Sequence, residues 1–195
     1  LSTAEIAVQA AEKGLANGID LSGDETEYPV SHFRAAFDLA RQAGLHVTVH
    51  AGEWAGPESV WNAVRLLQAE RIGHGVRASE DPELVEYLQR AGIPLEVCPT
   101  SNVCTGVYPS LAEHPIRQLY QAGLNVTVSS DDPPLFGTDL AQEYALLESV
   151  FGFEPEEIAA VTLNAVDAAF LPNEEKTHLR RKVVEGYQAL GVDAV

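Results

Sequence analysis

Short apolar runs that alternate with longer helix-like stretches are the feature that most constrains the fold of this chain. The strand candidates are 18–21, 45–50, 71–74, 94–98 and 125–129. The stretches between them are rich in Ala, Leu, Glu, Gln and Arg, and the helix candidates are 28–43, 57–68, 82–91 and 114–122. Because parallel strands need a long crossover connection, which is usually a helix, this alternation predicts a parallel α/β sheet.

Glycines mark the ends of three of these helix candidates. Gly44, Gly92 and Gly123 each follow an alanine, and the next strand begins within a few residues. Glycine readily adopts the left-handed conformation that terminates a helix. The C-terminal part differs, because it holds three helix-like segments without strands between them. These segments are 143–150, 155–164 and 174–190.

The composition limits the classes of partner. Of the 195 residues, 46% are hydrophobic and 21% charged, as in a soluble globular protein. The net charge of −17 repels a phosphate backbone, so we expect no nucleic-acid partner. We also expect no membrane partner, since no apolar run reaches the roughly 20 residues that span a bilayer. Two cysteines, Cys98 and Cys104, are too few for a disulfide framework, which predicts a cytoplasmic location.

Polar groups gather where the predicted strands end. The segments 23–25, 50–53, 100–102 and 131–132, together with His74, each follow a strand. The carboxyl ends of parallel strands meet at one face of a sheet or (β/α)8 barrel, and such folds build their active sites there. We therefore expect one site assembled from several loops.

His50 and Glu53 are the first of these groups. His50 closes an apolar run, where a neutral imidazole is a suitable metal ligand. Glu53, just past Ala51-Gly52, reaches the same pocket as a proton shuttle. The alternative is that the histidine lies at the surface and the glutamate caps a helix. An incidental surface histidine is a better description of His46, which starts the strand, than of His50.

The other candidates also have structural alternatives. His74 lies between two glycines that permit close approach of a ligand or backbone, but it also fits an ordinary turn. Asp131 and Asp132 repel each other unless a cation or a shared proton is present, but they also fit an Asx turn before two prolines. The Gly23 N–H suits the edge of a flat ligand, or lies in a plain loop. Asp20, in an apolar strand, needs a hydrogen bond if it is buried.

Together these groups indicate a metal-assisted hydrolase whose substrate the residues alone do not define. Two histidines, several acids and a glycine loop on one rim are typical of such a pocket. Cys98 fits a core cysteine before a polar loop at 100–102 better than a thiol nucleophile, because that motif contains no base.

The sequence also resembles the adenosine deaminase family, from about Gly18 to Phe170. The matching motifs, in the family's order and spacing, are GIDLSGDE (18–25), HAGE (50–53), RIGHG (71–75), CPTSN (98–102) and SDDP (130–133). The resemblance implies a (β/α)8 TIM barrel, of which this chain holds about five C-terminal strands and the C-terminal helices. It also implies one Zn2+ per active site and hydrolytic deamination of adenosine to inosine and ammonia.

The resemblance assigns roles in this chemistry to four residues. His50 and Asp131 correspond to zinc ligands, and zinc lowers the pKa of its bound water to about 7. Glu53 resembles the acid that protonates purine N1, which lets the ring accept electrons during attack at C6. His74 resembles the residue that orients the attacking hydroxide.

Two further residues correspond to groups that bind the base. Asp132 resembles the residue that hydrogen-bonds purine N7, and the Gly23 N–H would meet N3. The implied partner is a small-molecule purine nucleoside, with adenine or another 6-aminopurine as the alternative substrate. Two other readings are a non-catalytic pseudoenzyme and a metal hydrolase of a different substrate, although no strand end carries the lysine that such hydrolases use as a ligand.

One family element has no counterpart in the sequence. The family's first strand carries a His-x-His pair that supplies two more zinc ligands, and His32, His46, His114 and His178 do not match it. We therefore expect residues 1–195 to be the C-terminal portion of a single deaminase barrel domain. The N-terminal segment would then be supplied in cis or in trans.

We predict that residues 1–195 alone are neither monomeric nor active. Two protein ligands are fewer than the three of most catalytic zinc sites, and five parallel strands leave two sheet edges open to association. Solution mass, zinc content and adenosine turnover of the chain expressed alone test this. A monodisperse monomer with one tightly bound zinc ion and deaminase activity would contradict it.

Overall fold

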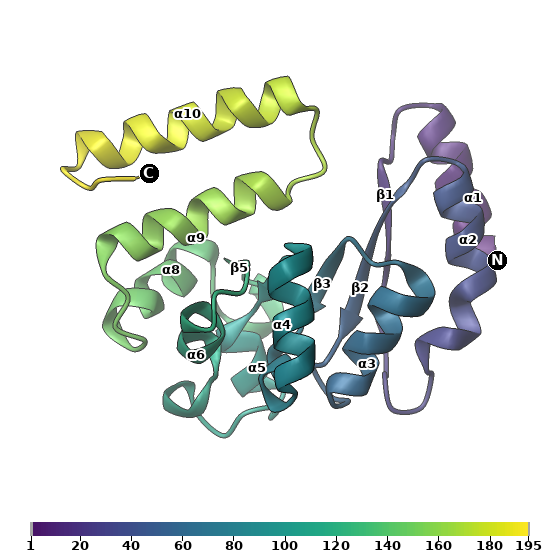
Figure 1. Cartoon of the computed structure of the whole chain (residues 1–195), viewed down its shortest axis with the longest axis horizontal. Coiled ribbons are helices and arrows are strands. Elements are labelled where there is room, and N and C mark those ends of the chain that lie inside the picture. Colours follow the sequence, from purple (N-terminus) through teal and green to yellow (C-terminus); the bar gives the residue numbers. More distant parts are fainter. Residues whose placement is uncertain (1, 195) are drawn as a thin grey trace. The chain divides into compact units, whose positions relative to one another are not determined.

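All five predicted strands are present in the computed structural model, which describes residues 2–194 (Figure 1). Strands β1 (Gly18–Leu21) and β3 (Arg71–His74) have the predicted bounds. Strands β2 (His46–Ala51), β4 (Leu95–Val97) and β5 (Val126–Val128) differ from the prediction by one residue at each end. Such differences are expected, because backbone pairing rather than side-chain pattern decides where a strand ends.

The chain divides after Leu95 into two compact units. In the first unit, β1 pairs in parallel with β2, and β2 pairs in parallel with β3. Strand β2 is buried along most of its length: Val47 and Val49 are inaccessible to solvent, and Thr48 is 5% exposed. Burial on both faces is typical of parallel strands that are covered by helices.

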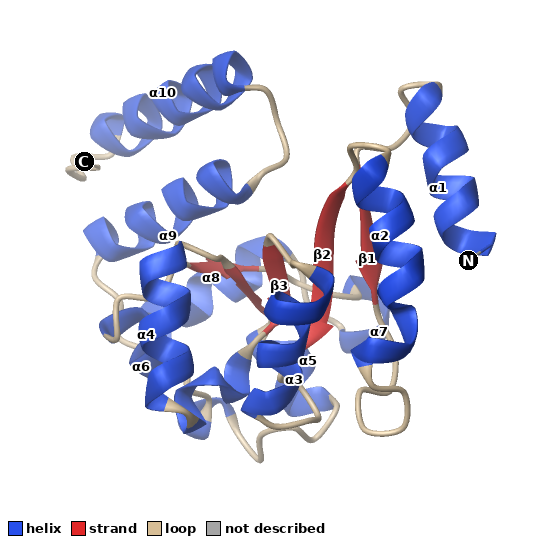
Figure 2. Cartoon of the chain, turned by 45° about the vertical axis from the view of Figure 1, so that its right-hand side comes forward, coloured by secondary structure: helices blue, strands red, loops and turns tan. Residues whose placement is uncertain are grey.

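The helices of the first unit precede β1 or connect successive strands. Helices α1 (Ser2–Glu12) and α2 (Arg34–Gln42) lie side by side (Figures 1 and 2). Helix α4 (Pro82–Ala91) has the predicted bounds, with Asp81 as its N-cap and Gly92 as its left-handed C-cap. Gly44 also has the predicted positive φ, at 80°.

Two helix predictions in this unit are only partly correct. The segment 28–43 begins as a 3₁₀ helix, η1 (Val30–Phe33), before α2 starts. The segment 57–68 consists of α3 (Pro57–Asn62) and a π-helical turn, η2 (Ala63–Leu67). The π-helical turn ends at Gln68, which has a φ of 55° without being glycine. Side-chain periodicity does not distinguish these tighter or wider turns from an α-helix. A further 3₁₀ helix, η3 (Val76–Glu80), follows β3.

The second unit begins within β4, after Leu95, and contains β5 and the helices of the C-terminal half of the chain. The Ser129 N–H at the end of β5 donates to the Val97 carbonyl of β4, at 2.9 Å. Its helical segments are α5 (Pro99–Cys104), η4 (Leu111–Glu113), α6 (Ile116–Gln121), α7 (Pro133–Phe136), α8 (Leu140–Ser149), α9 (Pro155–Ala168) and α10 (Asn173–Ala189). The last three confirm the predicted C-terminal helices, with bounds that differ by up to four residues.

The interpretation of 100–102 as a loop was wrong, because these residues lie in α5. Pro133 similarly starts the short helix α7 rather than continuing a turn. Proline at the first position of a helix is favourable, since its missing N–H has no intrahelical partner there and its fixed φ is already helical. Cys98 is buried, as predicted, and both cysteines are free thiols.

Helices α9 and α10 lie side by side at the C-terminal end of the second unit (Figure 2). Ala159 and Leu163 of α9 pack with Ala194, and the hydroxyls of Thr162 and Tyr187 are 2.8 Å apart. Between residues 2 and 194, no helix combines the length and the apolar character that crossing a bilayer requires.

Candidate active site

The ends of β2 and β3 bring three predicted site residues together in the first unit. The rings of His50 and His74 meet edge-on, with their centroids 5.2 Å apart. The His74 Nε2 lies 3.6 Å from a carboxylate oxygen of Glu53, and the side chains of His74 and Glu53 are only 3% and 13% exposed. The structure therefore groups two imidazoles and one carboxyl in a largely buried position.

His50 is held by the carboxylate of Asp20, whose oxygen lies 3.0 Å from Nδ1. When Nδ1 carries the proton and donates a hydrogen bond to Asp20, the lone pair of the neutral ring is on Nε2. Metal-binding histidines are commonly oriented in this way by a second carboxylate. Asp20 is exposed rather than buried, so its pairing with His50 is not forced by burial.

Gly73 makes room for the His50 ring. The two residues are direct partners in the parallel ladder, and a Cβ at position 73 would lie 2.9 Å from Nδ1 of His50. Gly75, with a φ of 66°, instead faces Leu95, since a Cβ there would lie 2.7 Å from that side chain. The two glycines around His74 thus leave room for the side chains of His50 and Leu95. The sequence alone did not reveal these contacts.

Two of the predicted site residues have an unusual backbone conformation. Among the described residues that are not glycine, only His74, Asp131 and Gln68 have a positive φ, at 61°, 55° and 55°. This conformation is costly for residues with a Cβ, and it is concentrated at functional positions in proteins. His74 and Asp131 adopt it where β3 and β5 end, whereas Gln68 ends a helical turn.

The loop after β2 is held by Glu25 and Arg77, neither of which has a role in the prediction from sequence. The Glu25 carboxylate accepts the N–H groups of Gly52 at 2.7 Å, Glu53 at 2.9 Å and Trp54 at 3.0 Å. On the other side, Nε of Arg77 donates to the Glu53 carbonyl at 3.0 Å. Glu25 belongs to the GDE motif, but its partners lie about 30 residues away along the chain.

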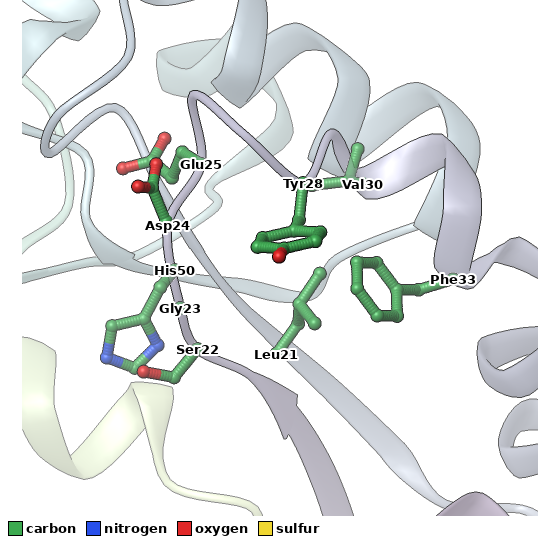
Figure 3. A pocket seen from close by; sticks show the side chains of 9 residues that line it. All are labelled: Leu21, Ser22, Gly23, Asp24, Glu25, Tyr28, Val30, Phe33 and His50. Atoms are coloured by element: carbon green, nitrogen blue, oxygen red, sulfur yellow. The ribbon is translucent and has the colours of Figure 1, made fainter.

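A cavity opens beside His50 in the same unit (Figure 3). Its lining residues are Leu21, Ser22, Gly23, Asp24, Glu25, Tyr28, Val30, Phe33 and His50. Figure 3 shows the side chains of Leu21, Tyr28 and Phe33 gathered toward one side and the imidazole of His50 toward the other. Gly23 has a φ of 149°, a conformation that side chains rarely permit.

Asp24, beside Gly23, has a local structural role. Its carboxylate accepts the hydroxyl of Thr26 at 2.6 Å and the N–H groups of Thr26 and Glu27. The hydrogen bond from the Thr26 hydroxyl is the main reason why the pKa of Asp24 is lowered. Asp24 therefore closes the turn that presents Gly23 to the cavity.

In the second unit, Asp131 and Asp132 follow β5 and both are exposed. The Ser101 hydroxyl donates to the Asp131 carboxylate at 2.7 Å. Asp132 is the N-cap residue of α7, and its carbonyl accepts the N–H groups of Leu135 and Phe136. Its carboxylate makes no capping bond, so the structural alternative of an Asx turn does not explain this residue.

The sequence analysis missed a buried carboxylate in the same unit. Glu143 of α8 is inaccessible to solvent and accepts the Thr138 hydroxyl at 2.6 Å and the Thr100 N–H at 3.2 Å. These bonds tie the start of α5, which carries Ser101, to α8. His114 is a core histidine, 3.1 Å from the Asn102 side-chain oxygen, in agreement with its exclusion from the site.

The family model for adenosine deaminase matches residues 2–186 of this chain. The chain belongs to the adenosine deaminase family. It is 48% identical over 179 residues to an adenine deaminase of Rhizobium leguminosarum, covering 92% of this chain and 55% of that protein. It is 44% identical over 182 residues to an adenosine deaminase of Klebsiella pneumoniae, covering 93% of this chain and 55% of that protein.

Solved structures of this family confirm the fold class. The crystal structure of an adenine deaminase from Arthrobacter aurescens matches with a TM-score of 0.90 at 34% identity, over 96% of this chain and 57% of that one. A zinc-bound amidohydrolase from Burkholderia ambifaria matches with a TM-score of 0.88 at 30% identity, over 96% and 54%. This deaminase-family chain thus has the fold of part of a TIM barrel, and it spans about half the length of the relatives it matches.

The contact between Gly73 and His50 gives a prediction for metal binding in the complete protein. Gly73→Ala places a methyl group 2.9 Å from Nδ1 of His50, so the ring must shift and its contact with Asp20 is disturbed. We expect weaker zinc binding with an unchanged fold, measured by competition with a zinc chelator and by circular dichroism. Gly56→Ala is the control, since a Cβ there meets nothing within 4 Å. Equal zinc affinity of the two variants would contradict the role assigned to Gly73.

Proposed function

We propose that the complete protein hydrolytically deaminates a 6-aminopurine, with adenosine, converted to inosine and ammonia, as the predicted substrate. The observation that carries the proposal is the cluster of His50, His74 and Glu53 at adjacent strand ends in a member of the adenosine deaminase family. A pseudoenzyme has no requirement for this cluster.

His50 and Asp131 would hold one zinc ion in this proposal. Imidazole nitrogen and carboxylate oxygen are donors that zinc accepts, and the bond from Nδ1 to Asp20 makes Nε2 of His50 the ligand atom. A zinc ion, when bound, lowers the pKa of its water to about 7 and so makes hydroxide available near neutral pH. The remaining ligands would be a His-x-His pair supplied by a segment outside this chain.

Glu53 would act as the proton donor. Its carboxyl is largely buried beside His74, and a positioned acid that protonates purine N1 makes C6 a better electrophile. His74 would orient the water that adds to C6. The bond from C6 to the exocyclic nitrogen then breaks, and ammonia leaves after that nitrogen has gained a proton.

Gly23 and Asp132 would position the base. Gly23 lines the cavity beside His50, and its N–H would donate to purine N3. The Asp132 carboxyl would bond N7. A backbone N–H and a carboxyl recognise the ring rather than the sugar, so these contacts are the same for a free base and a nucleoside.

Adenine is a second candidate substrate. The identity to an adenine deaminase, 48%, is somewhat higher than that to an adenosine deaminase, 44%. The cavity beside His50 offers the apolar side chains of Leu21 and Phe33 to a flat base, a surface that suits the ring of adenine.

Substrate choice is tested with the zinc-loaded complete protein and equal concentrations of adenosine and adenine. Release of ammonia and formation of inosine or hypoxanthine measure the two reactions. We expect deamination of adenosine. A kcat/KM for adenine well above that for adenosine would reverse the choice, and turnover of neither would support a non-catalytic protein.

The role of Glu53 is tested with Glu53→Gln, which keeps the shape of the side chain and removes the acid. We expect kcat to fall about 10²–10⁴-fold, the contribution of a positioned acid or base, while zinc stays bound. His50→Ala is the matched comparison, because it should lose both zinc and activity. Loss of zinc in Glu53→Gln would instead mark Glu53 as a ligand.

A further inference from the structure

Glu25 gathers four hydrogen-bond donors from one loop and the helix after it. Besides the successive N–H groups of Gly52, Glu53 and Trp54, its carboxylate accepts the Ser59 hydroxyl at 2.6 Å. Both oxygens are used, with Gly52 and Ser59 on one and Glu53 and Trp54 on the other. A carboxylate with this many donors fixes the backbone it contacts much more firmly than a single hydrogen bond does.

The carbonyl side of the same loop is fixed as well. The Gly75 N–H donates to the Ala51 carbonyl and the Arg77 N–H to the Gly52 carbonyl, both at 3.0 Å. The Arg77 side chain donates to the Glu53 carbonyl. Residue 53 is therefore held at its N–H by Glu25 and at its carbonyl by Arg77.

Three successive N–H groups that point the same way form a concave site for an anion. Without an acceptor, each partly buried N–H in this loop loses its partner, which costs free energy and favours a different loop conformation. The Glu53 side chain starts from this backbone and ends 3.6 Å from His74. A change in the loop would therefore move the Glu53 carboxyl relative to His74.

We propose that Glu25 is a positioning residue that holds the loop 52–54 so that Glu53 delivers its proton in the correct place. This inference rests on the proposed function, in which Glu53 is the acid. Glu25 itself contacts the loop and not the reacting atoms.

A purely structural role for Glu25 is the alternative, since Ser59 belongs to α3 and the same carboxylate anchors that helix. Asp81 offers a matched control for this alternative. It also lies in the first unit and accepts several donors, namely the N–H groups of Glu83 and Leu84 and the indole N–H of Trp61. It caps α4 and makes no hydrogen bond to the loop 52–54.

The experiment compares Glu25→Gln with Asp81→Asn in the zinc-loaded complete protein. The amide of glutamine has a single acceptor oxygen, so at least two of the four donors lose their partner. We expect kcat to fall about 10–100-fold, as for a misplacement of about 1 Å, with KM and zinc content unchanged. Asp81→Asn should lower the melting temperature without lowering kcat. Equal losses of kcat in the two variants would overturn the proposal.

A double variant shows whether Glu25 acts through Glu53. If it does, adding Glu25→Gln to Glu53→Gln causes no further loss of kcat, because the group being positioned is already absent. If the loss of kcat in the double variant equals the product of the losses in the two single variants, the proposal is overturned. If Glu53→Gln alone has wild-type kcat, the acid assignment of the proposed function fails first, and the two failures are distinguished.

If Glu25→Gln does not fold, the same measurement of kcat is made with Glu25→Asp. Aspartate retains the charge but is one methylene shorter, so it reaches fewer of the four donors. We expect kcat between those of the wild type and Glu25→Gln. A folded Glu25→Asp protein with wild-type kcat would overturn the positioning role.

Discussion

The register between β2 and β3 is the constraint on which the candidate site depends. It sets His50 opposite Gly73 and Ala51 opposite His74. A slip of one residue would turn every side chain of β2 to the other face and separate the two imidazoles. The buried residues Val47 and Val49 oppose such a slip, because it would exchange these apolar side chains with the polar side chains of Thr48 and His50 on the opposite face. The packing of the sheet thus fixes the position of His50.

Much of this arrangement was predictable from the sequence, and for physical reasons. Apolar runs bounded by helix-ending glycines reveal where strands lie, and parallel strands necessarily bring His50 and His74 to one edge. The short helix α5 was not predictable, because its six residues, which begin with Pro99, are too few to show a helical periodicity. The end of the π-helical turn at Gln68 was also not predictable, because no glycine marks this left-handed position.

The parts of the site that the sequence did not reveal are contacts between distant segments. Asp20 lies 30 residues before His50, and Glu25 lies 27 to 34 residues before its four partners. A single sequence shows which residue types occur, but not which carboxylate meets which donor. Gly73 illustrates the same limit, since its neighbour His50 explains it only after the strands are paired.

Acidic residues crowd the first unit near His50, and their partners determine what each can do. Asp20 is paired with an imidazole, and Glu25 accepts three successive backbone N–H groups and the Ser59 hydroxyl. Glu53, in contrast, has a largely buried side chain whose carboxylate lies 3.6 Å from Nε2 of His74. Carboxylates with different partners take different roles at one pH, as in other acid–base sites. Glu25 is therefore suited to hold structure, whereas Glu53 is suited to carry a proton.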